Sequence, residues 1–163
     1  MTTSSVQVRQ ALHEDAGVLA QLNQFVHGLH VAARPDVFRP APAVEELTPI
    51  FSGFLARERA IAFIAELGDG TPVGYITAII HDRPADALMH ARSFVFVEHI
   101  AVDPRVARTR VGSVLVEAVR AAGLEAGCTS LITDVWDFNK EALAFFGEGQ
   151  GLGPMRHWLE AKL

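Results

Sequence analysis

The stretch Phe94–Leu124, FVFVEHIAVDPRVARTRVGSVLVEAVRAAGL, decides the fold because a strand, a turn and a helix follow one another in it without a gap. Phe94 to Val102 is β-rich and largely apolar, which is typical of a strand covered on both faces. Asp103-Pro104 ends this strand, since proline has no N–H for a ladder and fixes its own φ. From Val111 the apolar residues follow the spacing of one helix face, at positions 111, 114, 115, 118, 119 and 122.

The loop between strand and helix carries three arginines, Arg105, Arg108 and Arg110, in a chain of formal net charge −5. A helix N-terminus offers unpaired N–H groups and a partial positive charge, so a loop that leads into one suits phosphate. Residues 108–113 therefore predict a site for a pyrophosphate group. The alternative is an ordinary strand-turn-helix with solvated arginines, because one glycine, Gly112, is weak evidence.

Length and composition predict one ordered domain over residues 1–163, since half of the chain is apolar, 20% is charged and no linker-like tract interrupts it. No run approaches the ~20 apolar residues of a membrane span, and MTTSSVQV lacks the layout of a signal peptide. The single cysteine, Cys128, excludes an internal disulfide and fits a cytoplasmic protein. Mild acidity argues against general nucleic-acid binding.

Hydrophobic periodicity predicts the remaining elements. Strands are expected at Val6–Arg9, Ala60–Leu67, Pro72–His81, Thr129–Val135 and Arg156–Leu163, and helices after His13, over Val44–Arg57 and over Asn139–Phe146. Pro49 is expected to split the second helix, and Asp82–Arg92 to form a polar loop. Trp136 and Trp158 are expected in core or rim packing.

The region around Gly112 resembles the GCN5-related N-acetyltransferase (GNAT) superfamily. There a loop written Gln/Arg-x-x-Gly-x-Gly/Ala binds the pyrophosphate of acetyl-CoA; residues 107–112 here read ARTRVG, so Gly112 matches while Ala107 and Arg110 depart. The resemblance implies an α/β (α+β) fold, with a mixed, mostly antiparallel twisted sheet of six to seven strands and about four helices. The implied order is β-α-α-β-β-β-α-β-α-β.

The resemblance also implies which residues contact acetyl-CoA. Backbone N–H groups of the central strand would meet the thioester carbonyl, and the loop would hold the pyrophosphate. The expected contacts are Ile100, Ala101, Val102, Arg108, Thr109, Arg110, Val111, Gly112, Ser113, Asn139 and Phe146.

Glu98 is the strongest catalytic candidate, because it interrupts an apolar strand and burying an unpaired carboxylate is costly. Strict alternation would place it on the face of Ile100, with His99 on the opposite face. The resemblance implies that Glu98 binds the amine or relays its proton. The alternative is a salt bridge to a neighbouring arginine.

The resemblance fails at the expected general acid. The superfamily often has Asn-x-x-Ala-x-x-Phe-Tyr in its last helix, and here Asn139, Ala142 and Phe145 match while Phe146 replaces the tyrosine. Phenylalanine cannot protonate a departing thiolate. An acyl-CoA-binding or sensing module without turnover is therefore the alternative to an enzyme, and a structural domain without a CoA site is a third possibility.

The acceptor site of the superfamily lies in and after the first helix. The residues here are His27, His30, Arg34, Asp36 and Phe38, and they are candidates for substrate selectivity. His27 and His30 show no third ligand that would indicate a metal. The resemblance implies an N-acetyltransferase that transfers the acetyl group of acetyl-CoA to a primary amine of a small molecule by direct attack. A homodimer is compatible with the resemblance.

Overall fold

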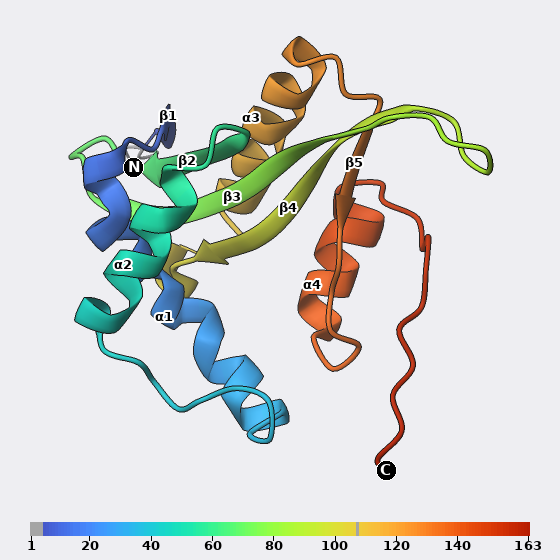
Figure 1. Ribbon diagram of the computed structural model, residues 1–163. Helices are drawn as coiled ribbons and strands as arrows, with labels where there is room; N and C mark the ends of the chain where they lie inside the picture. The colour runs from blue at the N-terminus through green and yellow to red at the C-terminus, as the bar shows by residue number, and fades with distance from the viewer. Residues whose placement is uncertain (1–4, 107) are drawn as a thin grey trace.

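Five strands form one sheet, in the order β1-β2-β3-β4-β5, in a computed structural model that describes residues 5–106 and 108–163 (Figure 1). The strands are β1 (Gln7–Gln10), β2 (Ala60–Glu66), β3 (Pro72–Arg83), β4 (Arg92–Val102) and β5 (Ser130–Thr133). The first four pair antiparallel to their neighbours, whereas β5 pairs parallel to β4. The parallel step is possible because a helix crosses between these two strands.

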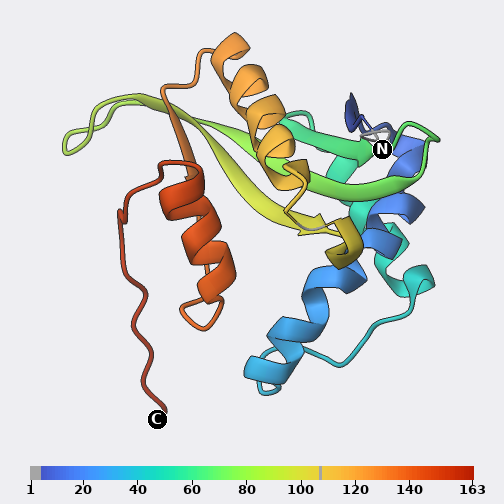
Figure 2. The same ribbon diagram turned by 180° about the vertical axis from the view of Figure 1, so that it is seen from behind.

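Helices cover both faces of the sheet (Figures 1 and 2). The long helices of one face are α1 (Ala16–Ala33) and α2 (Val44–Leu55), and α3 (Val111–Glu125) lies on the other. The short α4 (Lys140–Ala144) continues into a π-helical turn over Phe145–Gly149 and joins the side of α3. None of the helices in the described residues is long and apolar enough to cross a membrane.

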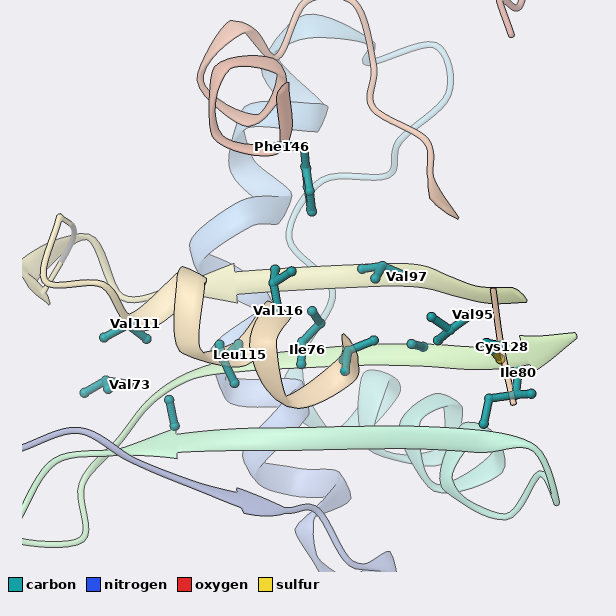
Figure 3. Close-up of a cluster of buried hydrophobic side chains, with 13 residues drawn as sticks. Val73, Ile76, Ile80, Val95, Val97, Val111, Leu115, Val116, Cys128 and Phe146 are labelled. Atoms are coloured by element: carbon teal, nitrogen blue, oxygen red, sulfur yellow. The ribbon is translucent and has the colours of Figure 1, made fainter. Parts of the chain in front are cut away.

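The core on the α3 side explains why β4 is apolar before Glu98. Val95 and Val97 are almost completely buried against Leu115 and Val116, which lie on one stripe of α3 (Figure 3). Phe146 reaches this core from the turn after α4 and is 5% exposed. Burying these side chains provides most of the stabilisation of this layer, at roughly 1.5–3 kcal/mol for each large apolar side chain.

The structure corrects several expectations from the sequence. The predicted last strand, Arg156–Leu163, is extended and exposed but pairs with nothing in the described chain, so the sheet has five strands rather than six to seven. Pro49 lies inside a continuous α2. The predicted loop Asp82–Arg92 is shorter, because β3 and β4 continue into a protruding hairpin (Figure 1). Trp158 is not packed, since 78% of it is exposed.

Candidate active site

The central strand β4 has two neighbours along its first half and only one along its second. Residues 94–97 pair with β3 on one side and with β5 on the other. The pairing with β5 stops at Val97 and Thr133, where β5 ends, whereas β4 continues to Val102 alongside β3. The two strands therefore part at the position of Glu98.

A β-bulge marks the same position. Thr77 of β3 lies opposite His99 and the next residue, Ala78, lies opposite Val97, so Glu98 is the extra residue of β4. A bulge adds one residue without adding a partner, and it resets the alternation of side chains. Bulges of this kind are common next to active sites.

This bulge overturns the expected orientations of the side chains that follow it. Ile100, like Val97, packs against the core of the α3 side, so it does not share a face with Glu98. His99 lies on the side of α1 and α2, with its ring 6.4 Å from that of Phe51. The Glu98 carboxylate lies on that side as well, 3.8 Å from the guanidinium of Arg57. The prediction from the sequence rested on side chains that alternate strictly between the two faces of β4, and the extra residue breaks this alternation.

Main-chain directions after the bulge follow from one hydrogen bond. The N–H of Asp103 donates to the carbonyl of Val73 at 2.8 Å, and ladder pairs alternate between bonded and non-bonded along an antiparallel pair. The main chain of Ala101 therefore points toward β3. The N–H groups of Ile100 and Val102 point the other way, toward the side that β5 has left.

The loop before α3 holds two arginines in the left-handed region. Arg108 and Arg110 both have φ of 66°, which costs roughly 1–2 kcal/mol for a residue with a Cβ. Both side chains are exposed, as is Thr109 between them. Arg110 is the N-cap of α3 and no side chain of the described residues caps this helix start. Ala107, the first residue of the family motif, lies outside the described residues.

The first turn of α3 contacts the core through one residue and the segment after α4 through two others. Val111 is 1% exposed and anchors the helix in the core. Gly112 lies against the ring of Phe145, because a Cβ built on it would come 3.0 Å from that ring. The hydroxyl of Ser113 accepts a hydrogen bond from the Gln150 side chain at 3.0 Å. These contacts hold the flank of the turn, and within the described part of the chain its terminal N–H groups have no side-chain cap.

The two residues predicted to contact the cofactor around α4 have structural roles: one caps the helix and the other is buried in the core. The Asn139 side-chain oxygen accepts from the N–H of Ala142 at 3.0 Å and caps α4. Phe146 points into the core rather than toward the surface (Figure 3). The only tyrosine of the chain does not replace the missing acid, since Tyr75 is buried on the α1 side with its hydroxyl bonded to Asn23 at 2.9 Å. Burial raises the pKa of Tyr75.

An aromatic cluster surrounds the predicted acceptor residues at the end of α1. The rings of His30 and Phe38 lie 5.0 Å apart, and Phe38 meets Trp136 at 5.5 Å. The guanidinium of Arg34 lies 5.5 Å above the Trp136 ring. Phe138 completes the cluster by stacking on Trp136. The sequence analysis did not single out Trp136 and Phe138 as candidate site residues, although both lie in the loop after β5 and loops often carry sites.

The rings of the predicted histidines contact main-chain carbonyl groups. One ring nitrogen of His27 lies 2.7 Å from the carbonyl of Arg39, and one of His30 lies 2.9 Å from that of Val26. Among the described residues, no three side chains that could ligate a metal come together.

Several neighbouring ionisable groups influence the pKa of His99. Its pKa is lowered from its ordinary value, chiefly because the surrounding protein desolvates the charged form, although part of the side chain remains accessible. Glu98 and Asp134 raise that pKa, whereas His27 and His30 lower it. All four are therefore near enough to influence its charge, and the ring is neutral at neutral pH.

The sequence model of the acetyltransferase (GNAT) family matches residues 24–152. This chain belongs to the GNAT acetyltransferase family. The match to the GNAT family includes the parted strands and the start of α3. No curated protein matches its sequence.

Several solved structures share this GNAT fold. The BH1408 protein from Bacillus halodurans has a TM-score of 0.86 at 23% identity, over 96% of this chain and 99% of that one. The aminoglycoside N-acetyltransferase AAC(6')-Iy, solved with CoA, has a TM-score of 0.76 at 19% identity, over 98% and 95%. AAC(6')-Ih from Acinetobacter baumannii has a TM-score of 0.70 at 14% identity, over 98% of each chain. At these identities the likeness shows the fold.

Proposed function

We propose that this GNAT chain is an acetyl-CoA-dependent N-acetyltransferase that acetylates a primary amine of a small molecule by direct attack. One observation carries the proposal: β4 and β5 part beside a helix start that no side chain of the described residues caps. The parting of β4 and β5 gives room for an extended ligand along the main chain of β4, and the uncapped start of α3 offers free N–H groups to a diphosphate.

The loop and first turn at residues 108–113 would hold the diphosphate of the cofactor. The left-handed conformations at Arg108 and Arg110 support this, because strained residues in a loop persist where the surrounding structure or a ligand requires them. Their exposed guanidinium groups add positive charge to the N-terminal end of the helix dipole. The residues present therefore fit a diphosphate, although neither arginine matches the family glycine.

Acetyl-CoA supplies an activated acetyl group as a thioester. The N–H of Ile100 would donate to the thioester carbonyl oxygen as negative charge develops on it, and that of Val102 would lie further along the same edge of β4. The role of Ala101 is limited to packing and its bond with β3. Such a donor is rigid because the other edge of β4 remains paired with β3.

Glu98 would bind the incoming amine and accept its proton, directly or through water. The orientation of Glu98 supports this role, since its carboxylate lies on the side of α1 and α2, where the predicted acceptor residues lie. The exposed ion pair with Arg57, at 3.8 Å, is too long for a hydrogen bond and leaves the carboxylate available. Neutral His99, beside Glu98, would be a second proton acceptor.

Departure of the CoA thiolate would proceed without a side-chain acid, because Phe146 is buried and Tyr75 lies in the other layer. A thiol is acidic enough to leave as its anion. Phe145 would contribute apolar surface next to Gly112, and Asn139 would act on the cofactor only through the position of α4.

The acceptor would be a cationic amine. Glu98 and Asp134 provide negative charge near His99, and the faces of Phe38, Trp136 and Phe138 suit a cation or an apolar ring. Two structural neighbours are aminoglycoside N-acetyltransferases, so aminoglycosides belong among the acceptors to be tested, together with polyamines and amino-acid amides. The buried thiol of Cys128 suits a reducing compartment such as the cytoplasm.

The alternative function is an acyl-CoA-binding or sensing module, which the replacement of the tyrosine acid by Phe146 favours. Thiol release separates the two. Purified protein is mixed with acetyl-CoA and each amine, free thiol is followed with a chromogenic disulfide, and CoA binding is measured by calorimetry. Amine-dependent thiol release supports the enzyme; tight CoA binding without release for any amine supports the module; and no CoA binding excludes both.

A further inference from the structure

The turn that follows α4 is π-helical, and this geometry brings two of its residues to the same helix. The turn covers Phe145–Gly149, and Gln150 comes next. In an α-helix, residues five positions apart lie about 140° apart around the axis, whereas a π-turn bonds residues five apart and brings them to nearly the same side. Phe145 and Gln150 are five positions apart, and both contact the first turn of α3. Such π-turns are frequent at functional sites.

Gln150 is attached to α3 through both its main chain and its side chain. Its carbonyl accepts a hydrogen bond from the guanidinium of Arg120 at 2.5 Å. Its side-chain Nε2 donates to the hydroxyl of Ser113 at 3.0 Å. Arg120 and Ser113 are seven positions, or about two turns, apart on α3, so they lie on the same side of the helix. The amide group of Gln150 therefore has a defined direction, toward Ser113.

Ser113 lies in the part of α3 that has unpaired N–H groups. The first α-helical hydrogen bond of α3 is that from the N–H of Val114 to the carbonyl of Arg110, at 3.0 Å, so the N–H groups of residues 111–113 precede it. In an α-helix, Cα–Cβ bonds tilt toward the N-terminus. The Ser113 hydroxyl therefore lies beside these N–H groups, at the end of α3 where the diphosphate is proposed to bind.

The hydrogen bond from Gln150 determines what the Ser113 hydroxyl can do. A serine hydroxyl has one proton to donate and two lone pairs that accept. The Gln150 amide occupies a lone pair, and no hydrogen bond among the described residues uses the Ser113 hydroxyl as a donor. The proton is therefore available to a ligand that accepts hydrogen bonds. The oxygen atoms of a diphosphate are charged acceptors, and hydrogen bonds to charged acceptors are among the strong ones.

We propose that Gln150 is a positioning residue for the diphosphate of acetyl-CoA: its amide donates to Ser113, and the Ser113 proton is thereby directed to the ligand. This inference rests on the proposed function, in which residues 108–113 bind the diphosphate. The first hydrogen bond strengthens the second, because hydrogen bonds in a chain polarise one another. A glutamate at this position would do the opposite, since a carboxylate accepts the hydroxyl proton and withdraws it from the ligand.

Calorimetry of CoA binding tests this role through the direction of the hydrogen bond. Gln150→Glu keeps the length of the side chain and its bond to Ser113 but reverses donor and acceptor, so CoA should bind at least about tenfold more weakly. Ser113→Ala should also lose about tenfold. In the Ser113→Ala background, Gln150→Glu should cost only about threefold, from charge repulsion alone. A Gln150→Glu loss that is equal with and without Ser113 overturns the proposal.

Gln150→Met separates positioning of the proton from a merely structural tie between the turn and α3. Methionine has a similar length but makes no such hydrogen bond, so the Ser113 hydroxyl rotates freely and CoA affinity should fall by about threefold. If Gln150 were only a tie, Gln150→Met, which breaks the bond, would weaken CoA binding more than Gln150→Glu, which keeps it. That order, after the charge effect from the Ser113→Ala background is deducted, overturns the inference.

The same titrations distinguish failure of this inference from failure of the proposed function. An unmodified chain that binds no CoA overturns both. An unmodified chain that binds CoA, with Gln150→Glu and Gln150→Met both within about twofold of it, overturns the role of Gln150 alone and leaves the diphosphate site in place. Thermal melts of all variants accompany the titrations, and each variant should melt cooperatively because Ser113 and Gln150 are only half-buried.

Discussion

The two halves of β4 differ in what surrounds them, although they belong to one strand. Residues 94–97 have a neighbouring strand on each side and valines buried under α3, whereas among the described strands residues 98–102 have only β3 beside them. The first half thus resembles any core strand, and the second half offers unpaired main-chain groups. The difference teaches that an open strand edge is produced here by ending one neighbouring strand and adding one residue, rather than by a special sequence motif.

The largest effect is expected in the paired half. Val97→Asp would bury a carboxylate where the side chain is 1% exposed, and should cost more than about 4 kcal/mol, enough to prevent folding. Val97→Ala, the control, should lose only about 2 kcal/mol and remain folded. Thermal melts by circular dichroism measure both. A cooperative melt of Val97→Asp near that of the unmodified chain would mean that this half is not core.

In the open half, substitution should change chemistry rather than stability. Glu98→Gln keeps the shape of the side chain but removes its basicity, so turnover should fall by about 100-fold while the melting temperature and CoA affinity change little. The control is Arg57→Gln, which removes the ion pair and should leave the rate within a few-fold. Equal rates for Glu98→Gln and the unmodified chain across pH would remove Glu98 from the mechanism.

At the helix start next to the open half, charge should decide affinity. Gly112→Asp and Gly112→Asn both place a side chain against Phe145 and should destabilise the fold similarly. Only the aspartate repels a diphosphate, and unit charges about 4 Å apart near a surface interact by several kcal/mol, so CoA should bind at least about tenfold more weakly to Gly112→Asp than to Gly112→Asn. Calorimetry gives both constants. Equal affinities would contradict a diphosphate site here.

The smallest expected effect concerns the strained loop. Arg110→Gly relieves a left-handed φ and should raise the free energy of unfolding by about 1 kcal/mol, which denaturant titration can measure. Thr109→Gly, at the intervening residue without a positive φ, should destabilise the chain instead. If both glycines destabilise, the conformation at Arg110 carries no strain.

The strand β4 was predictable from the sequence over both halves, but the orientations of the side chains after Glu98 were not. Two signals are local in the sequence: the run of apolar residues before Glu98 and the helical spacing of apolar residues from Val111. The strand and the helix that they indicate were both correctly predicted. A bulge leaves no periodic signal, because one added residue only shifts the alternation that follows. The wrong placement of His99 and Ile100 follows from this alone.

Contacts between residues far apart in the sequence could not be predicted either. Phe38 and Trp136 are almost a hundred positions apart in the sequence, and their meeting depends on where β5 ends relative to α1. The last strand failed for a different reason. The segment Arg156–Leu163 was predicted as a strand, but a strand also needs a neighbour, and no strand of the described residues pairs with this segment.

The extra residue at Glu98 changes the parity of the strand. Before it, odd-numbered positions such as Val95 and Val97 face α3; after it, even-numbered positions such as Ile100 do. Any comparison of this strand with a related one therefore has to count from the bulge and not from the strand end. In an alignment of the two strands, a gap placed at the wrong position would exchange the two faces for the residues between it and the bulge. The wrong side chains would then be assigned to the face of the proposed site.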